Sequence, residues 1–155
     1  MSKPIRVKAV CLCRYDRKIL LAEGYDPTKN EHYLMPIGGG VEFGELAEQA
    51  AVREVREEIG ADVSDLNLLG VSENRFTFDG VPGHEVVFVF EGILENSDLY
   101  QKERFKGIET NGVEFTVRWV PEEDVISGSI PVYPDGILSM LKRGELMNRA
   151  FNEIR

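Results

Sequence analysis

The chain has 155 residues, of which 43% are hydrophobic, and its formal net charge is −9. This size supports one compact domain with its own core and is short for two, so we expect a single domain over residues 1–155. The acidic balance disfavours direct binding of nucleic acid, which requires clustered Lys and Arg. No apolar run approaches the length of a membrane span, so we expect no membrane partner and a cytoplasmic location.

The first part of the chain predicts a hairpin, a loop and a third strand. Ile5–Arg14 and Ile19–Glu23 are rich in apolar residues and flank the turn residues 15–18. Cys11 and Cys13 alternate within the first of these segments, which is typical of reduced cysteines on one face of a strand. We expect a loop over Gly24–Glu31 and a short strand over Tyr33–Met35.

Three consecutive glycines, Gly38, Gly39 and Gly40, follow that strand. Glycine tolerates positive φ and close backbone approach, so we expect a glycine-rich loop here that leads into a helix. The chain then contains no Pro or Gly between Glu45 and Ile59, and Gly60 stands where a left-handed C-cap would end a helix. A helix from near Glu45 to Ile59 is the strongest prediction in the sequence.

The second part of the chain predicts further strands and two short helices. We expect strands over Leu66–Phe78, Val86–Leu94 and Val113–Val120, with the turn between the first two made by Asp79-Gly80 and Pro82-Gly83. The polar segment 95–112 indicates a loop with some helix. Residues 121–126 indicate a helical turn, and residues 135–143 a helix that packs on the sheet. Together these elements predict a layered α/β domain with a mixed sheet.

The predicted central helix has three distinct faces at about 100° per residue. We assign Val52, Val55 and Ile59 to the core, Gln49, Arg53 and Arg56 to the solvent, and Glu54, Glu57 and Glu58 to a third face. Like charges at these spacings destabilise an exposed helix, and Arg53 offsets part of that by pairing with Glu57. A solvated acidic face is one interpretation. The neighbouring glycines favour the other, an oxygen-ligand site for a divalent cation and phosphate.

Read from Gly39, the segment has five residues before Glu45, seven more, and then Arg53-Glu54-Val55-Arg56-Glu57-Glu58-Ile59-Gly60-Ala61. This spacing resembles the signature box of the Nudix hydrolases. Two positions depart from that pattern. Ala61 replaces a larger aliphatic residue, which affects local packing, and Ile37 separates Pro36 from the glycines, which affects the entry to them.

The resemblance implies the fold and the reaction of that family. It implies an α/β/α sandwich and an enzyme that hydrolyses the diphosphate bond of a nucleoside diphosphate linked to another group, through attack of a metal-bound water. The partner would be a small, nucleotide-derived diphosphate compound, and the cofactor Mg²⁺ or Mn²⁺. A homodimer is compatible with the general frequency of symmetric dimers.

The resemblance also assigns residues. Glu54, Glu57, Glu58 and the Gly38 carbonyl would bind metal, and Glu54, Glu57 and Arg53 would serve catalysis. Gly39, Glu45 and Gly60 would be structural residues of the box, with Arg53 holding Glu45 in place. Glu57 is our first candidate for the general base, and a later acid, Glu109 or Glu114, is the alternative.

The residues that recognise the substrate are not determined by the box. The candidates are Phe76, which could stack on a base, His84 and Glu114. Weaker candidates are Tyr25, Tyr33, Phe78, Tyr100 and Phe105 for stacking, and Arg14, Arg75 and Arg118 for phosphate. An alternative function is a nucleotide-binding or sensing module that does not catalyse. A further alternative, an acidic protein-interaction domain, predicts no metal-dependent change in thermal stability.

Overall fold

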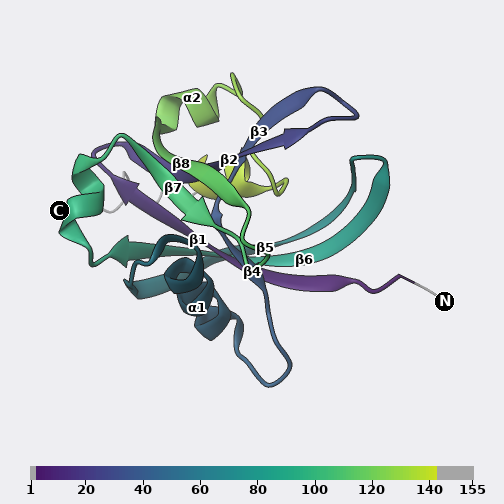
Figure 1. Ribbon diagram of the computed structural model, residues 1–155, viewed down its shortest axis with the longest axis horizontal. Coiled ribbons are helices and arrows are strands. Elements are labelled where there is room, and N and C mark those ends of the chain that lie inside the picture. Colours follow the sequence, from purple (N-terminus) through teal and green to yellow (C-terminus); the bar gives the residue numbers. More distant parts are fainter. Residues whose placement is uncertain (1–2, 143–155) are drawn as a thin grey trace.

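The computed structural model describes residues 3–142, and its described part contains a mixed β-sheet with helices on both faces (Figure 1). The elements are β1 (Arg6–Tyr15), β2 (Lys18–Asp26), β3 (Glu31–Met35), β4 (Ile37–Gly40), α1 (Ala47–Ile59), β5 (Val63–Phe78), β6 (Val81–Leu94), the 3₁₀ helix η1 (Ser97–Gln101), β7 (Arg104–Ile108), β8 (Glu114–Pro121) and α2 (Glu122–Ile126). Residues 137–142 are also helical, and residue 143 of the predicted last helix lies outside the described residues.

The strands pair in the order β5-β6-β1-β2-β8-β7, with β3 added to β2 and β4 added to β1. The β1–β6 pair is parallel, and the other pairs are antiparallel. β1 and β2 pair only at Arg14↔Ile19 and Tyr15↔Lys18. The sheet therefore splits beyond this hairpin into one part around β1 and another around β2.

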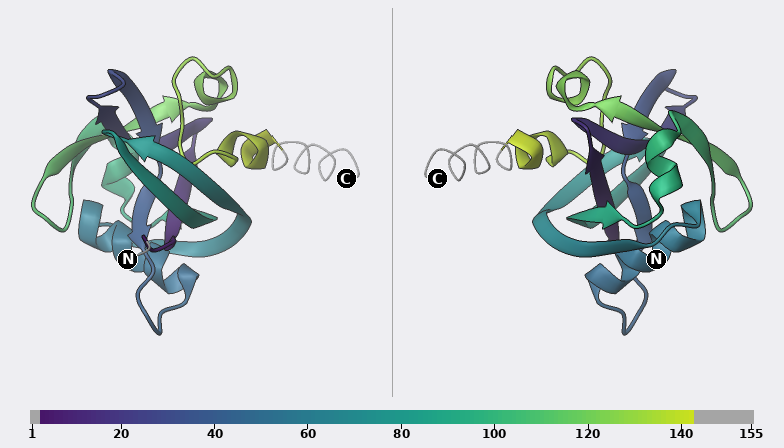
Figure 2. Two further views of the ribbon diagram at one scale, coloured as in Figure 1. Left: turned by 90° about the vertical axis from the view of Figure 1, so that its right-hand side faces the viewer. Right: turned by 90° about the vertical axis from the view of Figure 1, so that its left-hand side faces the viewer.

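Both faces of β1 and β2 are buried, which explains why their central residues are apolar without interruption. On one face, Cys11 and Leu20 share a core with Val55 of α1. On the other face, Leu12 and Leu21 share a core with residues that include Val125 of α2 and Ile137. Figures 1 and 2 show α1 on one side of the sheet and α2 with the last helix on the other. The predicted α/β/α arrangement is confirmed.

Helix α1 begins at Ala47, two residues after the predicted start at Glu45, and ends as predicted. Gln49 Oε1 accepts a hydrogen bond from the Leu46 N–H (2.9 Å), which satisfies a backbone donor at the helix start. Gly60 adopts φ 65° and its N–H donates to the Arg56 carbonyl, so it forms the predicted left-handed C-cap. Ala50 and Ala51 are fully buried against the sheet, and their small size brings α1 close to it.

Several predicted strands have different bounds because pairing extends them. β2 continues to Asp26 and β3 starts at Glu31, so most of the predicted loop over Gly24–Glu31 is a hairpin. The strands that turn at Asp79-Gly80 are confirmed, but Pro82-Gly83 lies within β6, opposite Thr77 and Phe76. The polar segment 95–112 contains β7, which we did not predict, as well as the helical η1.

Asp26 connects two of these turns. Its carboxylate accepts hydrogen bonds from the N–H groups of Thr28 (3.0 Å), Lys29 (3.2 Å) and Asp79 (3.3 Å). Burial by itself would raise the pKa of Asp26, but the N–H groups of Lys29, Asp79 and Thr28 outweigh it and lower the pKa below its usual value. Among the described residues, no helix is long and apolar enough to cross a bilayer.

Candidate active site

The glycine triplet forms the strand β4, so the predicted glycine-rich loop was wrong. Gly38, Gly39 and Gly40 pair with Val10, Ala9 and Lys8 of β1, and none of the three has a positive φ. Pairing with β1 supplies backbone hydrogen bonds that an isolated glycine loop would lack. The freedom of glycine to adopt positive φ is therefore not used here.

The expectation of close approach at these glycines is confirmed. A Cβ at Gly38 would lie 2.2 Å from the Ala9 carbonyl oxygen, so no side chain fits there. A Cβ at Gly39 would lie 2.6 Å from Cδ of Glu54. The Glu54 carboxylate thus occupies the place of a Gly39 side chain, and β4 acts as a flat support for the acidic face of α1.

Arg53 organises the carboxylates around this strand. Its Nε and Nη2 donate to Glu45 Oε2 and Oε1 (2.8 and 3.0 Å), and Nη2 also donates to the Gly40 carbonyl (2.9 Å). Its Nη1 donates to Glu54 Oε1 (2.9 Å) and Glu57 Oε2 (3.2 Å). The planar guanidinium fork suits such multiple contacts.

Arg53 does not face the solvent as predicted, since its side chain is only 24% exposed. Hydrogen bonding to Glu45 raises the pKa of Arg53 above its usual value, so its charge is permanent. In turn, the hydrogen bond from Arg53 lowers the pKa of Glu45. The pairs of Arg53 with Glu45 and Glu57 are those that we expected. Its hydrogen bond to the Gly40 carbonyl of β4 is a tertiary contact that periodicity alone does not predict.

Glu54 and Glu58 form a close pair of acids beside β4. Glu54 is buried, with 8% of its surface exposed. Glu58 follows Glu54 by one helical turn of α1. Burial is the largest cause that raises the pKa of Glu58 to about 8; the charge of Glu54 and hydrogen bonding to its carboxyl group add to it, and the Gly38 N–H opposes it. The buried Glu54 and the partly buried Glu58 therefore compete for ionisation, as expected where a cation would relieve their repulsion.

Glu57 is separate from this pair. Its side chain is 50% exposed, and it reaches the site through Arg53. Within residues 3–142 no three His, Cys, Asp or Glu side chains converge as a ready metal site. The predicted convergence of three glutamates is therefore seen as one direct pair, Glu54 and Glu58, with Glu57 beside it. The pair provides hard oxygen donors of the type that Mg²⁺ binds through one or two carboxylates, so the residues fit a divalent ion.

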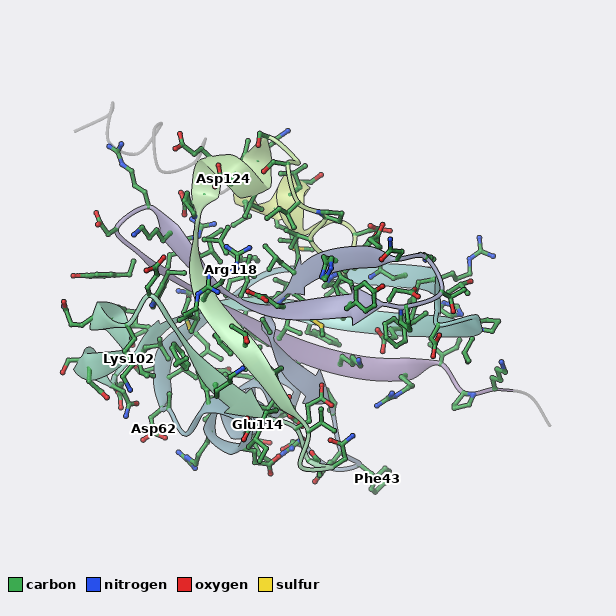
Figure 3. The ribbon with its side chains drawn as sticks, turned by 45° about the horizontal axis from the view of Figure 1, so that its top comes forward. Phe43, Asp62, Lys102, Glu114, Arg118 and Asp124 are labelled. Atoms are coloured by element: carbon green, nitrogen blue, oxygen red, sulfur yellow. The ribbon has the colours of Figure 1, made fainter. Side chains whose placement is uncertain are left out.

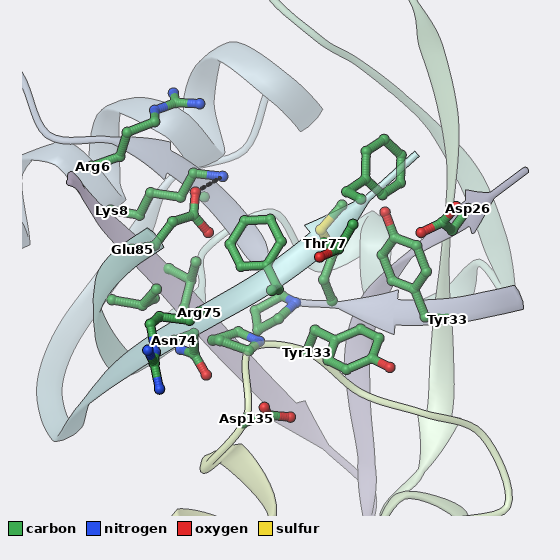
Figure 4. A pocket seen from close by; sticks show the side chains of 18 of the residues that line it. Arg6, Lys8, Asp26, Tyr33, Asn74, Arg75, Thr77, Glu85, Tyr133 and Asp135 are labelled. Atoms are coloured by element: carbon green, nitrogen blue, oxygen red, sulfur yellow. Dashed lines mark ion pairs between the residues drawn. The ribbon is translucent and has the colours of Figure 1, made fainter. Parts of the chain in front are cut away.

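A cavity of about 550 Å³ adjoins β4 at Gly38. It lies on the sheet face opposite α1, because Val10 and Val87 line it and belong to that core. Its aromatic wall is formed by Tyr33, Phe76, Phe78 and Tyr133, and Figure 4 shows Tyr33 and Tyr133 at the same side. The Tyr33 ring lies 5.5 Å from that of Tyr133 and 6.3 Å from that of Phe78, each edge to face. Such a wall can hold a planar ring.

The three substrate candidates have different positions. Phe76 lines the cavity. His84 does not line this cavity; it lines an adjoining hollow that shares Phe76 with it, and its Nε2 lies 3.3 Å from Glu73 Oε2. Glu114 is exposed at the start of β8 and lines neither hollow (Figure 3). Glu109 acts electrostatically on both Glu58 and Tyr33, so of the two later acids it is the one near the box.

The candidate arginines for phosphate binding are mostly engaged elsewhere. Arg14 pairs with Glu91 (3.3 Å) and Glu122 (3.5 Å), and Arg118 pairs with Glu23 (3.0 Å). Arg75 lines the cavity. Of the aromatic residues, Tyr100 stacks on Trp119 with ring centroids 5.7 Å apart and belongs to the core.

Several cavity residues were not predicted from the sequence, among them Arg6, Lys8, Tyr133 and Asp135. Arg6 and Lys8 alternate on β1, so a strand pattern places them on one face. That pattern did not reveal which face meets the glycines. Tyr133 and Asp135 are in a segment without regular structure, and Leu34 of β3 fixes it in place through backbone hydrogen bonds to Pro131 and Tyr133.

Comparison with known proteins agrees with this geometry. The family model of the NUDIX domain matches residues 4–137. A structure described as a NUDIX hydrolase from Nitrosomonas europaea superposes with a TM-score of 0.66 at 22% identity, covering 92% of this chain and 90% of that one. A MutT protein from Bacillus halodurans superposes with a TM-score of 0.57 at 18% identity, covering 89% and 80%.

Two relatives are similar in sequence. The RNA pyrophosphohydrolase of Hydrogenovibrio crunogenus is 25% identical over 115 residues, which are 66% of this chain and 69% of that protein. The NAD-capped RNA hydrolase NudC of Vibrio atlanticus is 44% identical over 57 residues, which are 37% of this chain. This chain spans only 20% of the length of that second relative.

Proposed function

The chain belongs to the Nudix family and is a Nudix-type hydrolase, and we propose that its substrate is a nucleoside diphosphate linked to another group, cut at the diphosphate bond with the aid of a divalent cation. The observation that carries this proposal is the Glu54–Glu58 pair against β4. Arg53 holds the buried Glu54, and the raised pKa of the partly buried Glu58 beside it shows that ionising both carboxyl groups is costly without a cation. The cost is explained if the site works with a cation bound.

We propose that Glu54, Glu58 and the Gly38 carbonyl hold Mg²⁺ or Mn²⁺, with Glu57 at its edge. Such an ion would neutralise the diphosphate and acidify the attacking water. Glu54 is fixed between Arg53 and Gly39, so its oxygens need little reorganisation to bind. Gly38 lines the cavity, and its N–H acts on Glu58, so we propose that the substrate extends from the cavity past β4 to the acidic pair.

Arg53 acts as a positioning residue in this proposal. It joins Glu45, Glu54 and Glu57 to the Gly40 carbonyl and thereby fixes α1 relative to β4. Because its guanidinium is saturated by these partners, it is not available to bind a phosphate.

The general base is Glu57 or Glu109. Glu57 is half exposed and next to the acidic pair, which supports our first choice. Glu109 is exposed on the loop after β7 and close enough to Glu58 to affect its pKa. Replacing each with Gln separates them, since loss of the base lowers kcat by at least about a hundredfold. If kcat falls less in Glu57→Gln than in Glu109→Gln, the general base is Glu109.

The aromatic wall of the cavity supports a nucleotide-derived substrate. Two relatives are named for reactions on RNA. For this chain the net charge of −9 supports small molecules, because RNA binding gains from basic surface. We expect nucleotides to be cleaved with a higher kcat/KM than a short RNA with a 5′-triphosphate.

The test is a screen of diphosphate compounds with Mg²⁺, in which phosphate release is measured and products are identified by mass. The variants are Glu57→Gln and Glu58→Gln, and the control is Glu48→Gln, which removes the same charge from an exposed position of α1. We expect losses above about tenfold for the first two and below about twofold for the control, since tenfold is about 1.4 kcal/mol of barrier. Losses below tenfold in both site variants contradict the site.

A non-catalytic nucleotide sensor is the alternative function. It predicts nucleotide binding, seen as a rise in melting temperature, without any product. The three glutamates of the box favour the enzyme, because a sensor gains nothing from their repulsion.

We further propose that the chain is a single domain, that it is cytoplasmic and that it forms a homodimer. A single domain over 1–155 is supported by the family match over 4–137. A cytoplasmic location is supported by the buried, free cysteines Cys11 and Cys13. A homodimer remains a prediction that light scattering can test.

A further inference from the structure

One edge of the sheet is a long strand whose outer side has no partner strand among residues 3–142. This strand, β5, ends the strand order and has 16 residues, whereas an average strand has about 5–6. It pairs only with β6, and within the described residues it makes no other backbone–backbone hydrogen bond. Every second residue of β5 therefore directs its N–H and C=O groups away from the sheet. Figure 1 shows the β5–β6 hairpin extending beyond α1 as a long, curved ribbon.

The second half of this strand lacks most of the protection that native edges have. Edge strands are usually protected by bulges, proline or charged residues, above all lysine. The register irregularities of β5 end at Gly70, and from Gly70 to Phe78 its pairing with β6 is continuous. This segment, residues 70–78, contains neither Pro nor Lys, and we call it the open edge. Val71, Phe76 and Phe78 are each 40% exposed or more, so the open edge is regular and partly apolar.

The two charges of the open edge have opposite signs and lie two residues apart. Because successive side chains of a strand alternate between faces, Glu73 and Arg75 point to the same face of the sheet. In agreement, Glu73 Oε2 lies 3.3 Å from Nε2 of His84, which is directly opposite Arg75 on β6. The Glu73 side chain is 70% exposed. Arg75 is exposed and forms no ion pair with the residues that the structure describes, so both charges can meet a further strand.

This arrangement of charges is self-complementary. When two copies of a strand pair antiparallel about a two-fold axis, the residue before the central one lies opposite the residue after it. With Asn74 at the centre, Glu73 of each copy lies opposite Arg75 of the other, and two ion pairs form. Centring the pair on Glu73 or on Arg75 would instead place like charges opposite each other, which destabilises a strand pair. The charges therefore select one register.

We propose that the open edge is the surface through which two copies of this chain associate, with β5 of one copy antiparallel to β5 of the other and Asn74 at the two-fold axis. The two sheets then form one continuous sheet, and the free N–H and C=O groups of both edges are satisfied. Val71 of each copy lies opposite Thr77 of the other, and both residue types favour strands. This inference assigns a surface to the proposed homodimer and does not depend on the proposed hydrolase activity.

Charge reversal tests the register. In a homodimer, Glu73→Arg or Arg75→Glu places like charges opposite each other at both positions. We expect the wild type to sediment as a dimer over a concentration series, and the dimer dissociation constant of each single variant to be at least about tenfold higher. A mixture of the two single variants should form a heterodimer, because one copy then carries two Arg and the other two Glu.

Two further variants complete this experiment. The double variant Glu73→Arg/Arg75→Glu restores opposite charges at both positions, so it should dimerise as the wild type does. The control is Arg104→Glu on β7, an exposed residue at the opposite edge of the sheet, and it should also leave the dimer unchanged. Circular dichroism should show that all these variants are folded, since each of the changed side chains is exposed.

A cross-link tests the same register without any change of charge. The variants Val71→Cys and Thr77→Cys are mixed and oxidised with copper phenanthroline. Opposite residues of an antiparallel pair have Cα atoms about 4.5–5.5 Å apart, which suits a disulfide. We expect linked dimers from the mixture and none from either variant alone, because the free cysteines Cys11 and Cys13 are buried.

Three results would overturn the proposed surface. They are a monomeric wild type, single charge reversals that dimerise as tightly as the wild type, and a mixture of the two cysteine variants that does not cross-link. A dimer that survives the charge reversals uses another surface. Absence of turnover on every diphosphate compound refutes the proposed function instead and leaves the dimer measurements unaffected.

Discussion

The substitution Gly39→Ala tests whether β4 positions Glu54, one of the proposed metal ligands. The new Cβ would lie 2.6 Å from Glu54 Cδ, 2.7 Å from Oε2 and 2.8 Å from Oε1. Ordinary contact between carbon atoms is about 3.5 Å or more, so the carboxylate has to move by about 1 Å. The backbone itself adapts easily, because Gly39 does not have a positive φ.

A displacement of this size is large for catalysis. Misplacing a reacting group by about 1 Å can lower a rate about a hundredfold, which is about 2.7 kcal/mol of barrier. We therefore expect Gly39→Ala to lower kcat/KM by about that factor. Melting followed by circular dichroism should show that the protein remains folded, since the displaced atoms are the end of one side chain.

Gly40→Ala is the matched control from the same strand. Its Cβ would meet only Arg6 Nη2, at 3.8 Å, which is ordinary contact. The assay is steady-state hydrolysis of the best substrate from the screen, with saturating Mg²⁺. We expect Gly40→Ala to keep kcat/KM within about threefold of wild type, a loss below about 0.7 kcal/mol. If Gly39→Ala is as active as Gly40→Ala, then Glu54 is not positioned by β4 and the proposed site is wrong.

Two other predictions concern charged residues. Arg53→Lys replaces the fork by a point charge and should lower kcat by about tenfold or more with a smaller effect on KM, while Arg56→Lys, whose partner is Asp62, should change neither. If Arg53→Lys and Arg56→Lys lower kcat equally, Arg53 is not a positioning residue. Because folding lowers the pKa of Asp26, its stabilisation is present above about pH 3.9, the unfolded value, and is lost as the pH falls through the folded pKa. The difference in urea midpoint between wild type and Asp26→Asn should thus shrink from pH 6 to pH 3, and a constant difference would contradict this assignment.

The sequence by itself determined the family and predicted the chemistry of the box. Glu54, Glu57 and Glu58 on one helix, next to glycines and closed by the Gly60 cap, predict a cation site from local spacing alone. The family match confirms the resemblance that these residues carry. The layered α/β fold was also predictable, because the hydrophobic periodicity of each strand and of the one long amphipathic helix can be recognised within a short stretch of sequence.

Only the tertiary structure decided how these parts meet. β4 is a strand because β1 pairs with it, and β1 lies far earlier in the chain. The Arg53 side chain is largely shielded from solvent because α1 packs against β4. This packing brings it into contact with Glu45 and the Gly40 carbonyl. β7 was missed because its polar residues form a strand only beside β8. Hydrophobic periodicity reports only on residues that are within about two helical turns of each other in the sequence. The contacts described above also depend on residues that lie farther along the chain. The cavity and the place of Arg6 within it belong to this second class.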